Sequence, residues 1–298
     1  MRQGASQGQP ADGVMLVRNE LRRPRLTAAT ADRHMLYEAS VQSIDVELDL
    51  FERVFRRMRG RAPRFLREDF CGTAAMACAW IHRGRKNSAL GVDLHRPTLR
   101  WAMQHHVRRL GKDADRISLI CDDVLSVQRP RADLVVALNY SYSVFKQRDQ
   151  LRRYFRNAHG SLRSHGLFIV DVFGGTEATD EIVEERKITA SIGPEGQRLP
   201  AFTYVWQQAH FNPITHEIRC RIHFKFRDGS RLRNAFAYDW RYWTIPEIRE
   251  IMLEAGFRSA VAYLEGWDDD SDEPDGIYRQ RRDFEEMAGW VGYVVGVK

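Results

Sequence analysis

The sequence predicts an α/β protein in which a doubly wound, mostly parallel sheet is joined to an antiparallel β insertion. Three observations indicate this class. Between residues 64 and 174, apolar runs of strand length alternate with segments of helical period. From about residue 180 to 240 the period becomes two, which is typical of antiparallel strands. An amphipathic helix and two apolar runs then close the chain, as expected for a sheet covered by helices on both faces.

The composition is that of a soluble globular protein. The 298 residues are enough to bury a core, and 43% of them are hydrophobic and 29% charged. No apolar run is long enough to cross a bilayer, and the N-terminus lacks a secretory pattern. The four cysteines show no metal-ligand spacing, so we expect no metal and free thiols in a reducing cytoplasm.

The chain is basic, with a formal net charge of +6, and only 6 of its 46 basic residues are lysine. The densest basic run spans residues 53–67. It either binds phosphate groups of a nucleic acid or forms the solvated, cationic end of a helix.

The helices and strands follow in order from periodicity and punctuation. Residues 1–30 lack a period and predict a flexible arm, which a helix from residue 32 to Gly60 follows. Strands are then expected at 64–69, 88–94, 117–124, 132–139 and 166–174, and helices at 73–84, 96–111 and 148–162.

The second half departs from this alternation. Strands are expected at 201–211, 217–226 and 231–240, a helix capped by Thr244, and closing strands at 259–267 and 290–298. Residues 268–283 carry no apolar face and predict a surface loop. We therefore divide the chain into an arm (1–30), a core (31–175), an insertion (176–242) and a C-terminal part that completes the core (243–298).

The stretch "FLREDFCGTAAMACAW", residues 65–80, is the first strand-to-helix turn, where doubly wound sheets bind nucleotide-type ligands. Gly72 lets the backbone approach a ligand, and Asp93, at the end of the next strand, suits two ribose hydroxyls. A dinucleotide needs a fuller glycine turn for its pyrophosphate, which Glu68 and Asp69 would repel. The turn therefore favours a cationic cofactor that carries no phosphate.

These segments resemble the successive motifs of class I S-adenosylmethionine-dependent methyltransferases, over residues 60–175 and 240–298. The resemblance implies a Rossmann-like sheet of seven strands, mostly parallel with the last antiparallel, and S-adenosyl-L-methionine as cofactor. The resemblance implies that the cofactor is bound by Glu68, Cys71, Gly72, Thr73, Asp93, Leu94, Asp122, Asp123, Val124 and Asn139. Phe70 and Ala74 replace the family's first and third loop glycines, which implies a stiffer loop.

The resemblance also places the acceptor. Asn139 and Tyr140 would border the transferring methyl, and "NYSYSVF" lacks the proline motif of enzymes that methylate base amines in nucleic acids. The insertion would cover the substrate, with His210 as a candidate base, although a lone strand histidine also serves as a structural hydrogen-bonding group. Candidate acceptor-binding aromatics are Tyr37, Tyr142, Tyr204, Trp206 and Trp240.

The resulting hypothesis is a cytoplasmic methyltransferase that acts on a small molecule by in-line displacement. One alternative is methylation of RNA or protein through the basic N-terminal region. Another is a non-catalytic scaffold that binds S-adenosylmethionine.

Overall fold

The computed structural model describes residues 26–194, 196–268 and 273–298, so most of the predicted arm lies outside the described residues. The largest element is an eight-stranded sheet with the order β13-β12-β14-β5-β4-β1-β2-β3. Strands β1 to β5 are parallel, whereas β14 and β13 run in the opposite direction. The strands are β1 (Phe65–Asp69), β2 (Ser88–Asp93), β3 (Ile117–Cys121), β4 (Ala132–Ala137), β5 (Leu162–Gly174), β12 (Ser259–Asp268), β13 (Glu273–Arg281) and β14 (Trp290–Val297).

Helices cover both faces of this sheet and make a three-layer core, which confirms the predicted doubly wound class. Along β4, Leu134 and Val136 face one core and Val135 and Ala137 face the other, because successive strand residues point to opposite faces. The first core contains side chains of α2, α3 and α4, and the second those of α5 and α6. The helices are α2 (Ile44–Arg59), α3 (Ala75–His82), α4 (Arg96–His105), α5 (Arg148–Ser161) and α6 (Ile245–Glu254), with 3-10 turns η1 (Val107–Arg116) and η2 (Ser141–Val144).

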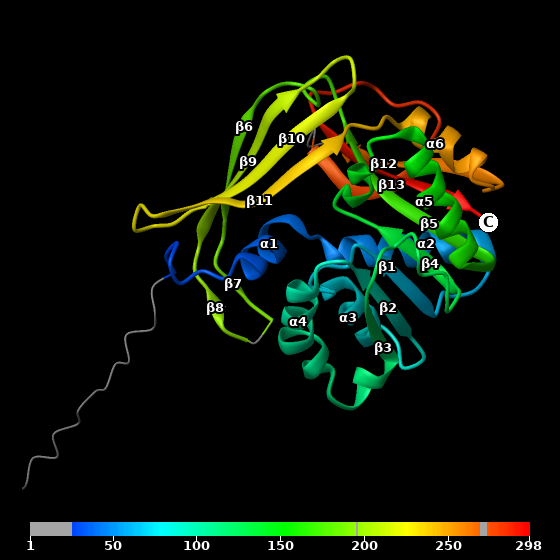
Figure 1. The fold of residues 1–298 in the computed structure, drawn as a ribbon, viewed down its shortest axis with the longest axis horizontal. Helices are drawn as coiled ribbons and strands as arrows, with labels where there is room; N and C mark the ends of the chain where they lie inside the picture. Colours follow the sequence, from blue (N-terminus) through cyan, green and yellow to red (C-terminus); the bar gives the residue numbers. More distant parts are fainter. Residues whose placement is uncertain (1–25, 195, 269–272) are drawn as a thin grey trace, which may run out of the picture.

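A second, four-stranded antiparallel sheet has the order β11-β10-β9-β6 and stands apart from the main sheet in Figure 1. It comprises β6 (Val183–Ile188), β9 (Phe202–Phe211), β10 (Glu217–Lys225) and β11 (Arg231–Arg241), and β7 (Ser191–Ile192) pairs with β8 (Arg198–Leu199) beside it. The three long strands were predicted. The charged strand β6 was not, because "VEERKI" shows no apolar alternation and is held by pairing with β9.

The predicted helix before Gly60 is in fact two helices. Helix α1 (Arg33–Val41) ends at Gln42, whose backbone is extended, and α2 begins after Ser43. The two helices serve different sheets: Leu36 of α1 packs with the small sheet, while Phe51 of α2 packs on the main one. A single straight helix does not reach both cores.

Two further predictions were wrong in detail. Residues 273–281 form the edge strand β13 rather than a loop, which gives the sheet eight strands instead of seven. The helix expected to end at Gly111 ends at His105 and continues as a 3-10 segment in which Gly111 has a non-helical φ of 57°. In the part of the chain that the structure describes, no helix is both long and apolar enough to span a membrane.

Candidate functional site

The turn after β1 takes a left-handed path through three of its residues. The φ angles of Phe70, Gly72 and Ala74 are 56°, 50° and 53°. Only glycine adopts this region without strain, and an L-residue there costs about 1–2 kcal/mol. Packing offsets the cost at Phe70, whose ring lies 5.5 Å from that of Tyr154, while Ala74 is fully buried. The loop thus has three residues in left-handed conformations, although only one of them is glycine.

The two acids before this turn have different surroundings. Asp69 is buried and accepts hydrogen bonds from Arg67 Nε at 2.7 Å and from the Tyr154 hydroxyl at 3.0 Å. Arg67 also donates to the carbonyl oxygen of Val127 and to the Ser161 hydroxyl, at 2.6 and 2.7 Å. Asp69 is therefore half of a buried ion pair that ties β1 to its neighbours, and its charge does not face the turn.

Glu68, by contrast, lines a cavity of about 570 Å³ at the carboxyl end of β1. Its Oε2 accepts from the backbone N–H of Ala77 at 3.0 Å, and burial raises its pKa to about 8. Asp93 lies across the same cavity and accepts from the N–H groups of Gly72 at 2.8 Å and His95 at 2.7 Å. Asp93 thereby holds the backbone of the glycine turn in place. Its carboxylate oxygens can still accept further hydrogen bonds from a ligand.

Two features of this cavity suit an adenosyl cofactor with a cationic methionine part. The buried Thr73 hydroxyl has no hydrogen-bond partner, and a Cβ built on Gly72 would meet nothing within 4 Å. The cavity therefore has open space at the turn, an unpaired polar group, and carboxylates for hydroxyl and ammonium groups. Cys71 also lines it, but burial raises the pKa of its thiol well above the ordinary range, so it is a packing residue.

Four other predicted cofactor residues line neither cavity described here. Leu94 is 68% exposed, and Val124 is buried in the core. Asp122 is exposed and Asp123 is half-buried, and the Asp123 carboxylate accepts from the backbone N–H of Leu125 at 2.8 Å. A role for these four residues in binding the cofactor stays a prediction.

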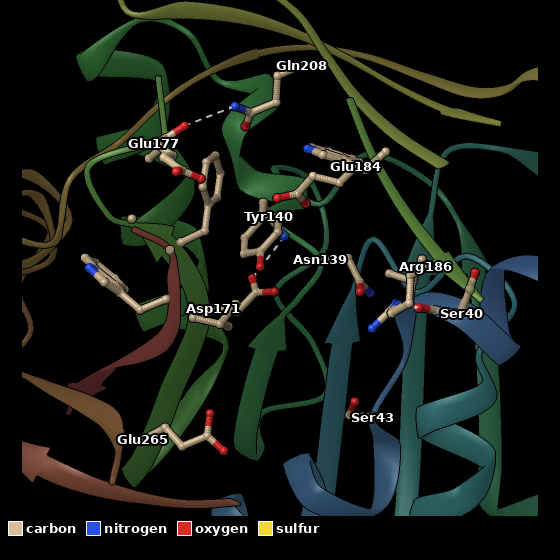
Figure 2. A pocket seen from close by; sticks show the side chains of 18 of the residues that line it. Ser40, Ser43, Asn139, Tyr140, Asp171, Glu177, Glu184, Arg186, Gln208 and Glu265 are labelled. Atoms are coloured by element: carbon tan, nitrogen blue, oxygen red, sulfur yellow. Dashed lines mark hydrogen bonds between the residues drawn. The ribbon is translucent and has the colours of Figure 1, made fainter. Parts of the chain in front are cut away.

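A larger cavity, of about 1190 Å³, lies between the strand ends of the main sheet and the small sheet. Figure 2 shows Asn139, Tyr140 and Asp171 grouped at its centre, with Glu177, Glu184 and Glu265 around them. Asn139 and Tyr140 follow β4 in left-handed conformations, with φ of 54° and 56°. The backbone N–H of Tyr140 donates to Asp171 Oδ1 at 3.0 Å, which explains how this strained turn is held.

The two cavities share three lining residues, Tyr37, Asn139 and Tyr238. Tyr37 comes from α1 and Tyr238 from β11, so both sheets and the first helix meet at one point. The two cavities therefore adjoin at these side chains.

The structure brings most of the predicted acceptor aromatics together. Tyr204, Trp206 and Trp240 line the larger cavity, as Tyr37 does. Tyr142 does not, because it is 2% exposed and its hydroxyl donates to the carbonyl oxygen of Asp171 at 2.8 Å within the core. His210 also lies outside both cavities, and its Nδ1 is 3.2 Å from Glu181 Oε1, so its role as a base stays a prediction that this geometry does not support.

Sequence reasoning missed Asp171, Glu47 and Tyr238. Asp171 carries a signal, since it is an acid within the apolar strand run "GLFIVDVFG". Burial raises its pKa well above the usual carboxylate value. Glu47 sits on the inner face of α2, where burial raises its pKa to about 7 against the opposing effect of the Tyr293 hydroxyl. Tyr238 gave no signal, because strand alternation does not tell which face meets the cavity.

The arginine-rich run 53–67 is largely engaged elsewhere. Arg53 donates to the carbonyl oxygen of Tyr278 at 2.9 Å, Arg56 pairs with Glu52, and Arg61 pairs with Asp133. None of the run's arginines lines either cavity, so the run does not form part of this site.

No protein-family model and no curated protein matches this sequence. Solved structures do share its fold. The sugar N-methyltransferase KedS8 from Streptoalloteichus aligns over 100% of this chain and 99% of its own, with a TM-score of 0.61 and 16% identity. CalS10, an amino pentose methyltransferase from Micromonospora echinaspora with bound S-adenosylmethionine, covers 88% of this chain and 95% of its own, with a TM-score of 0.61 and 15% identity.

An S-adenosylmethionine-dependent methyltransferase from Clostridium acetobutylicum covers 88% of this chain and 96% of its own, with a TM-score of 0.59 and 15% identity. At these identities the likeness shows the fold alone. It is the class I, Rossmann-like fold that these methyltransferases share.

Proposed function

We propose that the chain is an S-adenosylmethionine-dependent methyltransferase that acts on a small molecule. The observation that carries this proposal is the junction of two cavities at Tyr37, Asn139 and Tyr238. The smaller cavity contains the glycine turn and Asp93, and the small sheet covers the larger one. Two of the neighbours of known structure, KedS8 and CalS10, are methyltransferases of sugars, which supports a small acceptor.

The residues of the smaller cavity fit the cofactor. Asp93 would accept hydrogen bonds from the ribose hydroxyls, and the N–H groups and hydroxyl of Gly72 and Thr73 would contact the methionine part. Glu68 would offer a buried carboxyl group, which the positive charge of the bound cofactor would favour in its ionised form. S-adenosylmethionine supplies a methyl group on a sulfonium, which is already activated towards nucleophiles. The protein's main task is then to align an acceptor at Asn139 and to exclude water.

The shape of the larger cavity favours a small acceptor over RNA or protein. Its walls include the aromatic rings of Tyr204, Trp206 and Trp240, and the arginines of the basic run are engaged outside it. An RNA substrate needs an exposed basic groove at the methyl instead. The four cysteines are unpaired, which supports the proposal that the enzyme works in the reducing cytoplasm.

Two measurements test this function. Titration calorimetry should detect S-adenosylmethionine binding and no comparable binding of NAD. Labelled S-adenosylmethionine should then transfer its methyl to a member of a metabolite panel and not to total RNA. A protein that binds the cofactor but methylates neither would be a scaffold, and tight NAD binding without S-adenosylmethionine binding would refute the proposal altogether.

A further inference from the structure

The wall of the larger cavity is rich in carboxyl groups. Five carboxylates line it without an ion-pair partner among the described residues: Glu47, Asp171, Glu177, Glu184 and Glu265. A sixth, Glu185, pairs with Lys225 at the rim. Arg186 is the only lysine or arginine among the described lining residues, and it donates to the carbonyl oxygen of Ser40 and lies over the Tyr204 ring at 5.4 Å.

Two of these carboxylates are nearly inaccessible to solvent, Asp171 at 5% and Glu47 at 8% exposure. Burying a carboxylate without a cation is costly, because the interior solvates charge poorly. The raised pKa values of both groups express that cost. A ligand with a positive charge would remove it, whereas an anionic acceptor would add to it.

We propose that the acceptor is a positively charged amine whose nitrogen is held by the Asp171 carboxylate next to Asn139. The inference rests on the proposed function and narrows it to transfer onto nitrogen. Asp171 is the best placed of the five acids, because its Oδ1 already accepts from Tyr140 N–H at 3.0 Å, one residue from the junction of the cavities.

Aromatic rings complete the environment expected for an ammonium group. The Tyr140 ring lies 4.8 Å from that of Phe173, and Tyr238 stacks on Trp240 at 4.1 Å. All four line the cavity. Ring faces attract cations and leave a neutral hydroxyl group without such a gain.

The chemistry balances without another reactant. The ammonium gives a proton to the Asp171 carboxylate, and the nitrogen lone pair then forms a bond to the methyl carbon. The carbon–sulfur bond breaks with its electron pair left on sulfur, which becomes a neutral thioether. The product nitrogen carries the positive charge that the sulfonium lost, and the proton leaves Asp171 for solvent.

The test uses matched acceptors that differ in one group: amino sugars against their parent sugars, and amino alcohols against the corresponding diols. We expect methylation of amines at nitrogen, with kcat/KM at least about 100-fold above that of the hydroxyl twins. Asp171→Asn should lower kcat/KM for the amines by about 100-fold, since it removes one partner of a buried charge pair. The asparagine oxygen still accepts from Tyr140 N–H, so the turn should persist.

Cofactor affinity is the readout that separates the two proposals. Asp171→Asn and Glu47→Gln should both bind S-adenosylmethionine within about 3-fold of wild type. Asp149→Asn, on the exposed side of α5, is the matched control and should leave turnover unchanged. Should Asp171→Asn fail to fold, loss of turnover on amines in Glu47→Gln carries the test.

Three results would overturn the inference: methylation at oxygen or carbon, equal turnover of amine and hydroxyl twins, or no turnover of any amine. None of them would contradict the proposed binding of S-adenosylmethionine. If the wild-type protein did not bind S-adenosylmethionine at all, the proposed function itself would be refuted.

Discussion

At the scale of single residues, the turn after β1 shows that packing can replace glycine. Ala74 has a φ of 53° and is fully buried, so its strain coexists with contacts in the core. Ala74→Gly relieves about 1–2 kcal/mol of strain and loses a similar amount in chain entropy and methyl burial. We expect its free energy of unfolding to stay within about 1 kcal/mol of wild type in urea titrations.

Ala102, equally buried but in the right-handed helix α4, is the control. Ala102→Gly loses the same methyl and entropy with no strain to relieve, and should cost about 1.5–2.5 kcal/mol. Equal costs at the two positions would show that Ala74 is not strained.

Asp93 has two tasks that one variant tests together. Asp93→Ala should weaken S-adenosylmethionine binding by about 2–3 kcal/mol, because it loses ribose hydrogen bonds and also frees the Gly72 N–H that the carboxylate holds. Calorimetry measures the effect, with Asp149→Ala as a surface control. Unchanged affinity would mean that the ribose lies elsewhere.

Glu68 makes stability depend on pH. Its folded pKa of about 8 lies above the usual 4.5, so the folded protein holds a proton that the unfolded chain releases. This stabilisation is complete below the unfolded pKa and is lost as the pH rises through the folded one. Relative to wild type, Glu68→Gln should therefore gain at least about 1 kcal/mol between pH 5.5 and 8.5 in urea titrations without cofactor. A difference that is constant with pH would contradict the shift.

At the scale of elements, α1 closes the smaller cavity. Trp101 of α4 donates to Asp32 at 2.7 Å, His106 lies 2.8 Å from Glu38, and Tyr37 packs on Phe236 of β11 at 4.9 Å. Asp32 also caps α1 by accepting from His34 and Met35 N–H. These contacts hold the helix at both ends over the turn after β1.

Asp32→Ala should loosen this helix by about 1–2 kcal/mol, since it loses the cap and the Trp101 bond. Hydrogen exchange should quicken for the α1 amides and not for those of α3. Glu52→Ala, which breaks an ion pair on α2, is the control. Unaltered exchange in α1 would show that packing on β11 alone holds the helix.

Elements with continuous apolar runs were predictable, because β4 and the second half of β5 are buried on both faces. The charged strands β6 and β13 were not, since pairing with β9 and β12 decides their conformation. In the site, Asp93 followed from its place at a strand end. Tyr142 and His210 do not line the larger cavity, because the direction of a side chain depends on tertiary packing. Asp171 could not be assigned to the site from the sequence, because only the structure shows that this acid in an apolar strand lines the larger cavity.

At the scale of the whole molecule, the small sheet and the main sheet divide the work. The main sheet supplies the turn and acids of the smaller cavity, and the small sheet supplies the aromatic wall of the larger one. Specificity for the acceptor should therefore depend on the small sheet.

Trp206→Ala should lower kcat/KM for the acceptor by about 10–100-fold, because buried aromatic anchors contribute most to binding, while cofactor affinity stays unchanged. Changing Arg56 and Arg57 together to alanine should alter neither, as Arg56 is 60% exposed and pairs with Glu52. Loss of methyl transfer in the arginine variant alone, with label found in RNA, would point to a nucleic-acid substrate instead.

The eighth strand has a consequence for colloidal behaviour. Strand β13 pairs with β12, whose residues Tyr263 and Leu264 are each 4% exposed. Without β13, the open edge of the sheet would be a strand with apolar side chains and free backbone groups, a template for another chain. The edge that β13 presents carries Asp275, Arg279 and Arg281 beside the 42% exposed Ile277, with Gly276 in a left-handed conformation. We therefore expect the charges and the bend of β13 to disfavour self-association at this edge of the sheet.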